Sequence, residues 1–278
     1  MSLSINTNIA ATRASQYLAS NHQNLQKSLD RLSSGKRITG PADDAGGLAV
    51  SMKLEHSING LKGVANGISN GISVLQVQDG VLQSVADIVT RIGELKSMYD
   101  DVSKSSSDKD LYDNELQDLG AQITQIVTNT KLNDVVLIDV AGSADAKTVQ
   151  LDTSGSNSMT ITDDNFLGGA GMAKLVLATA SFDSTAAGAV ATSDITAALN
   201  EVAALRAGNG GEVKRLEYAL ASVNTQITNL TAANGRIVDV DIAQESANLA
   251  RQQILVQASA AMVAQANSAN NVALQLLQ

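Results

Sequence analysis

The two ends of this 278-residue chain carry the same repeating pattern of small and apolar residues. In both segments these residues recur at alternating steps of three and four, which is the spacing of a coiled-coil contact line. Neither helix can bury such a line alone, so we expect the first to pair with the last and to bring the chain ends together. The N-terminal line comprises Ala11, Ala14, Leu18, Asn21, Leu25, Ser28 and Leu32. The C-terminal line comprises Leu249, Gln253, Val256, Ala260, Val263, Asn267, Asn270, Leu274 and Leu277.

The larger apolar members of the two lines form what we call the assembly seam. Asn21, Asn267 and Asn270 interrupt the two lines. Two interpretations of these amides are open: they are tolerated surface positions, or they are buried and fix the pairing register at some cost in stability. The assembly seam comprises Leu18, Leu25, Leu32, Leu249, Val256, Val263, Leu274 and Leu277.

Composition disfavours several classes of function. Hydrophobic residues make up 44% of the chain but aromatic residues only 2%, so the core must be aliphatic, which favours helix-on-helix packing. The scarcity of aromatic rings and the net charge of -9 argue against nucleic-acid binding. With no cysteine and two histidines, disulfides and thiolate metal sites are excluded and a zinc site is disfavoured. No segment has the roughly 18 apolar residues of a membrane span, and the start lacks the features of a cleaved secretory signal.

Between its ends, the chain predicts a very long helix followed by a shorter one. The single proline, Pro41, predicts a break over residues 34–43, after which Asp43 or Asp44 caps a helix of about 50 residues. Two neighbouring apolar stripes along that helix predict burial against more than one partner. Polar residues 104–110 predict a turn, and the next helix follows it.

Beyond residue 133 the period of the pattern changes. Residues 135–140 are a β-branched run, and residues 147–153 and 158–162 alternate around a turn signal, so we expect a small antiparallel hairpin or meander. Residues 166–192 are rich in small residues and predict a loop with one strand at 174–180. Helical periodicity resumes at residue 195 and falters at residues 207–211, and the last helix is expected to start near residue 240.

These elements predict a mainly α fold, in which long antiparallel helices form a terminal coiled coil and a helical rod, with a small antiparallel β insert. We expect three regions. Residues 1–40 and 238–278 form the terminal coiled-coil inner domain. Residues 41–130 and 193–237 form the helical rod domain, and residues 131–192 form the small β-hairpin and variable loop region.

No constellation of residues points to catalysis. Asp43 and Asp44 lack partners at metal-ligand spacing, so helix capping explains them better than a carboxylate site. Residues 208–211 are too short for a phosphate-binding loop and follow a helix rather than a strand. His22 lies one place from the contact line and is best explained as a polar or solvated position. We therefore predict a structural protein rather than an enzyme, with no catalytic, cofactor-binding or metal-binding residues.

The two terminal regions resemble those of bacterial flagellins. The similarity covers Ile-Asn-Thr-Asn-Ile-Ala-Ala at 5–11, Ser-Leu-Asp-Arg-Leu-Ser-Ser-Gly-Lys-Arg-Ile at 28–38 and Asp-Asp-Ala-Gly-Gly-Leu-Ala-Val at 43–50. At the other end, Arg-Ile-Val-Asp-Val-Asp at 236–241 and Met-Val-Ala-Gln-Ala-Asn at 262–267 match in order. Asn270 departs from the family, which often has proline there, and Gly63 and Gly67 add flexibility to the long helix. The middle is short, which implies that large outer domains are missing.

The resemblance implies a structural subunit that polymerises into the helical bacterial flagellar filament for motility. It also implies export through the flagellar type III apparatus with an export chaperone, contact with cap and hook-junction proteins, and a secreted, extracellular location. The terminal helices are expected to be disordered in the monomer and to order on assembly. Each also has a second apolar side for neighbouring subunits, comprising Ile5, Ile9, Leu29, Ile254, Met262, Ala266 and Leu276.

Two alternatives remain: a hook–filament junction protein with similar terminal helices, and a binding module acting as a surface adhesin or innate-immune ligand. In many flagellins a vertebrate Toll-like receptor contacts an arginine, a leucine and a glutamate, and the matching positions here are Arg91, Leu95 and Glu115. Gly93 replaces a second basic residue that the family often has nearby. The competing interpretation places Leu95 in the core and the two charges on solvated helix faces.

Overall fold

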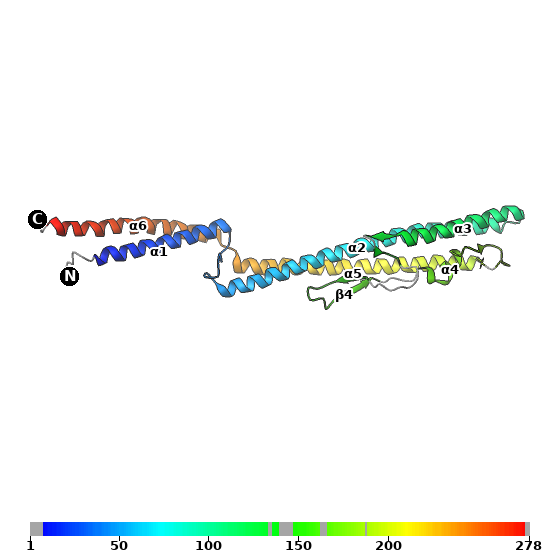
Figure 1. The fold of residues 1–278 in the computed structure, drawn as a ribbon, viewed down its shortest axis with the longest axis horizontal. Helices are drawn as coiled ribbons and strands as arrows, with labels where there is room; N and C mark the ends of the chain where they lie inside the picture. Colours follow the sequence, from blue (N-terminus) through cyan, green and yellow to red (C-terminus); the bar gives the residue numbers. More distant parts are fainter. Residues whose placement is uncertain (1–7, 133–134, 139–146, 162–165, 187, 276–278) are drawn as a thin grey trace. The chain divides into compact units, whose positions relative to one another are not determined.

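The computed structural model describes residues 8–132, 135–138, 147–161, 166–186 and 188–275. The chain divides into two compact units: unit 1 contains Met1–Ile58 and Thr228–Gln278, and unit 2 contains Asn59–Ile227. The fold is mainly α with small two-stranded sheets, as predicted (Figure 1). The predicted division into three regions stays a prediction.

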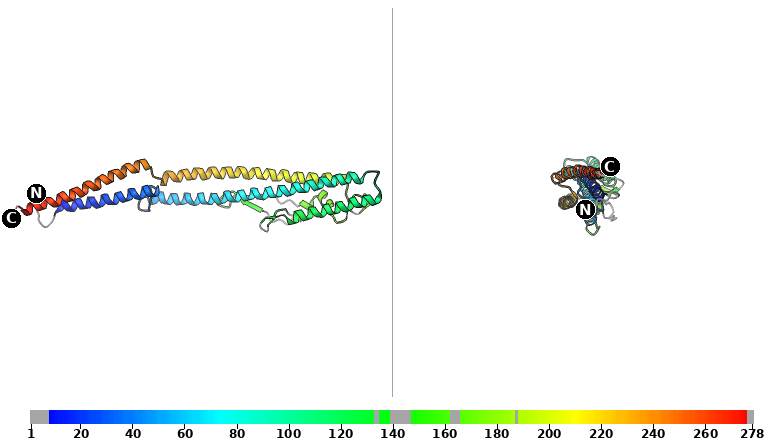
Figure 2. Two further views of the ribbon diagram at one scale, coloured as in Figure 1. Left: turned by 90° about the horizontal axis from the view of Figure 1, so that it is seen from above. Right: turned by 90° about the vertical axis from the view of Figure 1, so that its left-hand side faces the viewer.

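Unit 1 is built on helices α1 (Ile9–Ser34) and α6 (Ile242–Gln275), which lie side by side and antiparallel (Figures 1 and 2). Local chemistry sets their ends. The side chain of Asn8 accepts a hydrogen bond from the Ala11 amide at the start of α1, and Gly35 ends the helix with a left-handed φ of 69°. Asp241 accepts from the amides of Ala243 and Gln244 and so starts α6.

The break after α1 is confirmed and has a defined structure. The Arg37 amide donates to the Val238 carbonyl at 2.6 Å, and the Val240 amide donates to the Gly35 carbonyl at 3.1 Å. This short antiparallel pairing joins the segment after α1 to the segment before α6, and it buries Ile38 and Val238. The segment ends where α2 (Ala45–Tyr99) begins, and Asp44 accepts from the Gly47 amide at 2.8 Å in its first turn.

Unit 2 packs α2 against α3 (Ser106–Asn129) and α5 (Thr192–Val238). The helix α5 runs antiparallel to α2, since Ile195 lies near Gly93, Arg206 pairs with Asp79, and Leu216 lies near Gly71. The core is aliphatic with two phenylalanines. Its larger members include Leu82, Val85, Val89, Ile92, Leu95, Leu116, Ile123, Val127, Leu137, Phe166, Met172, Leu175, Phe182, Ile195 and Val202.

The turn between α2 and α3 is shorter than predicted. Residues 104–110 were expected to form a turn, but α3 begins at Ser106. The Ser105 hydroxyl and the Asp108 carboxylate form a reciprocal capping box, with the Ser105 amide donating to Asp108 at 3.1 Å. Polar residues therefore start this helix rather than interrupt it, which a hydrophobic pattern alone does not reveal.

The predicted hairpin is confirmed in β3 (Lys147–Gln150) and β4 (Ser158–Ile161), which pair antiparallel with Val149 opposite Met159. A shorter antiparallel pair joins β1 (Lys131–Leu132) to β2 (Val135–Val136). The part of the predicted 135–140 run beyond residue 138 lies outside the described residues, as does residue 162.

The loop predicted over residues 166–192 is wrong for much of that segment. It contains a 3₁₀ turn, η1 (Phe166–Gly168), the short helix α4 (Ala170–Leu175) and a parallel pair, β5 (Ala180–Ser181) with β6 (Gly188–Ala189). The Glu201 carboxylate on α5 accepts from the amides of Gly171 and Met172 at 3.1 and 3.0 Å. A side chain distant in sequence therefore caps α4, so no local signal announces the helix.

The helix α5 continues through residues 207–211, where its periodicity was predicted to falter. None of the helices in the described residues is both long and apolar enough to cross a membrane.

Candidate functional site

The contact line predicted on α1 lies against α6. Its seven residues are half-buried or, for Ser28, buried, whereas the residues between them are mostly exposed. Leu18, Leu25 and Leu32 all belong to this line. The periodicity of α1 was therefore sufficient to identify the face that meets its partner.

The contact line predicted on α6 is partly wrong. Leu249, Val256 and Val263 are half-buried as expected, but Gln253, Ala260 and Asn267 are exposed. The alternate positions are instead occupied by the preceding residues, Gln252, Ser259 and Ala266. Leu274 lies in α6 but its side chain is outside the described residues, and Leu277 lies outside them altogether.

Polar contacts across the helix pair explain this one-residue difference. The Asn21 amide donates to the Ser259 hydroxyl at 2.6 Å and to the Leu255 carbonyl at 3.4 Å. The Asn8 amide donates to the Ala266 carbonyl at 2.9 Å. Hydrophobicity favoured Ala260 as the partner position, whereas hydrogen bonding selects Ser259.

Of the three asparagines considered as register-fixing residues, Asn21 makes the specific cross-helix contact. Asn267 is exposed, and the side chain of Asn270 is outside the described residues. Asn8 and Ser259, which sequence reasoning missed, carry the remaining specific contacts. Asn8 could have been recognised from its position as a cap at the start of the periodic segment.

Ion pairs join the C-terminal half of α1 to α6 and to the segment that follows α1. Arg31 lies 3.9 Å from Glu245 of α6, whose residue is only 6% exposed. Lys27 lies 2.5 Å from Asp43, which also accepts from the amide and hydroxyl of Thr39 at 3.1 and 2.9 Å. The hydrogen bond from Lys27, followed by those from Thr39, holds the pKa of the Asp43 carboxyl well below its usual range. Asp43 is thus a structural anchor between α1 and the segment that follows it.

The helix pair leaves much apolar surface uncovered. Among the side chains of α1 and α6 whose burial the structure describes, no apolar one is fully buried. Ile9, Leu29, Ile254 and Met262 of the predicted second side are exposed, the last two by 66% and 62%. Ala266 was wrongly placed on that side, since it faces α1, and Ile5 and Leu276 lie outside the described residues. These side chains leave apolar surface on both helices in contact with water.

The three predicted receptor-contact residues lie together in unit 2. Arg91 donates to Glu115 on α3, with its Nη2 2.9 Å from Oε1, and also pairs with Glu94 at 3.0 Å. Both Arg91 and Glu115 side chains are more than two-fifths exposed. Leu95 is 0% exposed and belongs to the core, so its side chain offers no surface to a partner in this fold.

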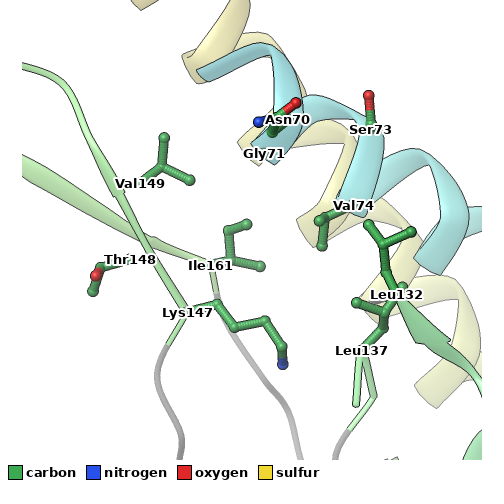
Figure 3. A pocket seen from close by; sticks show the side chains of 10 residues that line it. All are labelled: Asn70, Gly71, Ser73, Val74, Leu132, Leu137, Lys147, Thr148, Val149 and Ile161. Atoms are coloured by element: carbon green, nitrogen blue, oxygen red, sulfur yellow. The ribbon is translucent and has the colours of Figure 1, made fainter. Parts of the chain in front are cut away.

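A hollow of about 380 Å³ lies between α2, β1 and the β3–β4 hairpin (Figure 3). Its lining is mainly apolar and includes Val74, Leu137, Val149 and Ile161, with Lys147 at its edge. Within the described parts of the chain, no group of three or more histidine, aspartate or glutamate side chains is placed to hold a metal ion. The hollow therefore has packing chemistry rather than the convergent polar groups of a small-molecule site.

Comparison with known proteins gives matches over nearly the whole chain. The bacterial flagellin N-terminal helical region matches residues 5–142, and the bacterial flagellin C-terminal helical region matches residues 192–277. The flagellar filament 33 kDa core protein of Treponema phagedenis is 33% identical over 287 residues, covering 99% of each chain. Flagellins of Halalkalibacterium halodurans and Bacillus subtilis are 33% and 32% identical, again covering 99% of each chain. The crystal structure of Bacillus cereus flagellin covers 61% of this chain and 94% of that chain, at 22% identity and a TM-score of 0.47.

Proposed function

Because the chain belongs to the bacterial flagellin family, it is a structural subunit of the flagellar filament, and we propose that α1 and α6 form its polymerisation surface. The observation that carries this proposal is the incomplete burial of both helices: the seam side chains from Leu18 to Val263 are half-buried, and large apolar side chains elsewhere on the two helices are exposed. Two long helices of this kind need further partners to remove that surface from water.

In this proposal the two sides of the helix pair have different partners. The assembly seam holds α1 to α6 within one subunit, and the exposed side, with Ile254 and Met262, contacts other copies. A repeated contact between unlike surfaces does not close on itself and so generates a helical polymer. The terminal helices would then gain most of their stability on assembly.

Variants on the exposed side of α6 test the proposed surface. Ile254→Ser combined with Met262→Ser should abolish filaments seen by electron microscopy of concentrated protein seeded with filament fragments. The control exchanges two exposed polar residues of the same helix, Gln253→Ser and Gln257→Ser, and should still assemble. In both variants the circular dichroism of the monomer should match that of the parent chain. Normal filaments from the apolar double variant would overturn the assignment of this surface, although not membership of the family.

A truncation tests the requirement for α6 itself. Removing residues 240–278 should abolish filaments and leave a folded helical middle, since the main core lies within unit 2. Filaments of normal length from the truncated chain would contradict the proposed role of α6. For the full-length chain, low copy number and failure to grow long filaments alone would instead favour the hook–filament junction alternative.

The route by which the chain reaches the filament is also a proposal. Family membership supports export through the flagellar type III apparatus with an export chaperone, assembly under the cap next to hook-junction proteins, and an extracellular location. Secretion into the medium by a strain that lacks the cap protein, and its loss when the export apparatus is deleted, would test this route. That the chain has no enzymatic activity stays a prediction.

Recognition by a Toll-like receptor is a second candidate function, supported by the exposure of Arg91 and Glu115 on adjacent helices. A receptor-reporter assay on the monomer should lose signal on Arg91→Ala if this surface is recognised. Arg215→Ala, at an exposed position of α5, is the matched control. The buried position of Leu95 limits any such contact to the charged side chains. An equal signal from both variants would exclude this surface as the contact.

A further inference from the structure

The sequence contains five asparagines that are directly followed by glycine, and all five pairs lie in α2 or α5. Asparagine is among the chemically labile residues. A following glycine makes its side chain most accessible to the backbone, because glycine has no Cβ to hinder the approach. The pairs are Asn59–Gly60, Asn66–Gly67, Asn70–Gly71, Asn209–Gly210 and Asn234–Gly235.

The reaction open to such a pair is intramolecular. The backbone nitrogen of the glycine attacks the side-chain Cγ of the asparagine, and a new C–N bond closes a five-membered succinimide ring. The bond from Cγ to the side-chain nitrogen breaks, and ammonia leaves with the proton of the glycine amide. Water then opens the ring at either carbonyl and gives aspartate or isoaspartate. No electrons are exchanged with another molecule, and water is the only co-reactant.

Helical structure prevents the first step. In an α-helix the glycine N–H donates to the carbonyl four residues earlier, and the ψ angle of the asparagine, near -42°, turns that nitrogen away from Cγ. The pair reacts only when the local helix opens. The rate at each site therefore reports how often that segment of helix unfolds.

Tertiary packing holds four of the five pairs. Asn59–Gly60 lies between buried Ile58 and Leu61, Asn66–Gly67 precedes fully buried Ile68, and Gly71 is itself buried beneath Val149 and Leu216. The Asn234 carboxamide oxygen is enclosed, and Gly235 lies close to the Asp239 carboxylate. Opening the helix at these pairs requires the loss of packed side chains.

The fifth pair lies in a segment with fewer packed neighbours. No residue from 207 to 211 is fully buried, and a Cβ at Gly208, Gly210 or Gly211 would meet no atom within 4 Å, as is also true at Gly67. Each of these glycines weakens the helix relative to alanine. The segment that sequence periodicity singled out is thus helical, but it contains three glycines within four residues and no buried side chain.

We propose that Asn209 is a site of spontaneous deamidation in the folded subunit, opened by fluctuation of the glycine-rich segment of α5. The product places a carboxylate one helical turn from Arg206, which holds Asp79 of α2 with a 2.8 Å contact from Nε to Oδ1. It also stands one turn from the buried Glu212. Residues three apart on a helix face each other, so the new charge competes with Asp79 for Arg206 and repels Glu212.

Peptide mapping of the purified full-length protein after timed incubation tests this proposal. Trypsin cuts after Arg206 and Lys214, so the peptide 207–214 contains Asn209 as its single asparagine. Mass spectrometry follows the exchange of amide for acid, and chromatography separates aspartate from isoaspartate. In the folded protein, Asn209 should react several-fold faster than Asn66, the internal reference with an exposed glycine. In denaturant, the rates at the two sites should become similar.

The double variant Gly208→Ala with Gly211→Ala separates helix stability from intrinsic chemistry, because it leaves the Asn209–Gly210 pair intact. It should slow reaction at Asn209 by roughly 20-fold in the folded protein, from the helix propensities of the two exchanged residues. In denaturant the variant and the parent should react at similar rates. Equal rates at Asn209 and Asn66 in the folded parent, or a folded double variant as reactive as the parent, would overturn the proposal.

Discussion

At the scale of single residues, a few polar side chains decide how the terminal helices align. Asn21 and Asn8 of the α1 segment each donate across to α6, and the apolar residues between them provide contact area without specifying register. A line of similar aliphatic residues can pair in several registers with comparable burial. A hydrogen bond distinguishes one register, because shifting it leaves an amide without its partner.

Replacing Asn21 should weaken the pairing of α1 with α6. Asn21→Ala removes the hydrogen bond to Ser259 and should cost about 1 kcal/mol per subunit, lowering the temperature at which filaments dissociate. A cycle with Ser259→Ala isolates the coupling between the two side chains, which should be well above zero. Asn24→Ala, at an exposed position of the same helix, should leave the temperature unchanged. Additive effects of Asn21→Ala and Ser259→Ala would show that the hydrogen bond between these side chains does not stabilise the helix pair.

The Asp43 anchor makes stability depend on pH. Its pKa is lower in the folded protein than in the unfolded chain, where it is about 3.9. The contribution of the Asp43 carboxylate to the free energy of unfolding is therefore complete above the unfolded pKa. It is lost as the pH falls toward the lower folded pKa. Asp43→Asn should cost about 1 kcal/mol at neutral pH, a modest value because Lys27 is 45% exposed.

The difference between Asp43→Asn and the parent should shrink as the solution is acidified below about pH 4, where the anchor is lost in the parent as well. Filament dissociation temperatures measured across this range provide the test. Asp30→Asn, an exposed carboxylate on α1, controls for net charge. A difference that stays constant with pH would show that Asp43 acts by a route other than its charge.

At the scale of elements, close approach of backbones fixes where helices meet in unit 2. Gly120 of α3 is buried against α4, and a Cβ there would lie 2.3 Å from the Leu175 carbonyl oxygen. The same residue type on an open face of α2, such as Gly80, has no atom within 4 Å of the position of a Cβ. A side chain at Gly120 would therefore clash with a neighbouring backbone, whereas a side chain at Gly80 would not.

Alanine exchanges at these two glycines should change stability in opposite directions. Gly120→Ala forces α3 and α4 apart and should destabilise unit 2 by about 2 kcal/mol. Gly80→Ala removes a helix-weakening residue without a clash and should stabilise it by up to about 1 kcal/mol. Urea unfolding followed by helical circular dichroism measures both. A neutral Gly120→Ala would mean that α4 moves away at little cost.

At the scale of the whole molecule, buried apolar side chains are distributed unequally. Unit 2 contains nearly all of them, whereas those described in unit 1 lie outside α1 and α6, at Ile38, Ile58 and Val238. Long helices without buried apolar side chains are marginal in water, and most helical stability in proteins comes from packing. We therefore expect unit 2 to fold by itself and the terminal helices to depend on assembly.

The chain should therefore gain helix when it polymerises, and the gain should lie in unit 1. Circular dichroism should show higher helicity in filaments than in monomers. Hydrogen exchange should show strong new protection in α1 and α6, with the protection of α3 changed far less. Equal helicity in the two states, or equal protection of α6, would contradict folding coupled to assembly.

The sequence by itself determined the features that depend on local periodicity and specific motifs. These are the contact line of α1, the break near Pro41, the length of α2, the β3–β4 hairpin and the family resemblance, which the comparisons confirm. Each follows from residues close together in the chain, where spacing alone indicates which side chains share a face.

Only the tertiary structure decided the features set by distant partners. Ser259 rather than Ala260 faces α1 and accepts the hydrogen bond from Asn21, and Glu201 of α5 caps α4. Leu95 is in the core because α3 and α5 cover α2 at that point. In each case the deciding free energy comes from a hydrogen bond or a contact between segments far apart in sequence. Periodicity identifies which residues share a face, but the partner opposite that face decides which of them are buried.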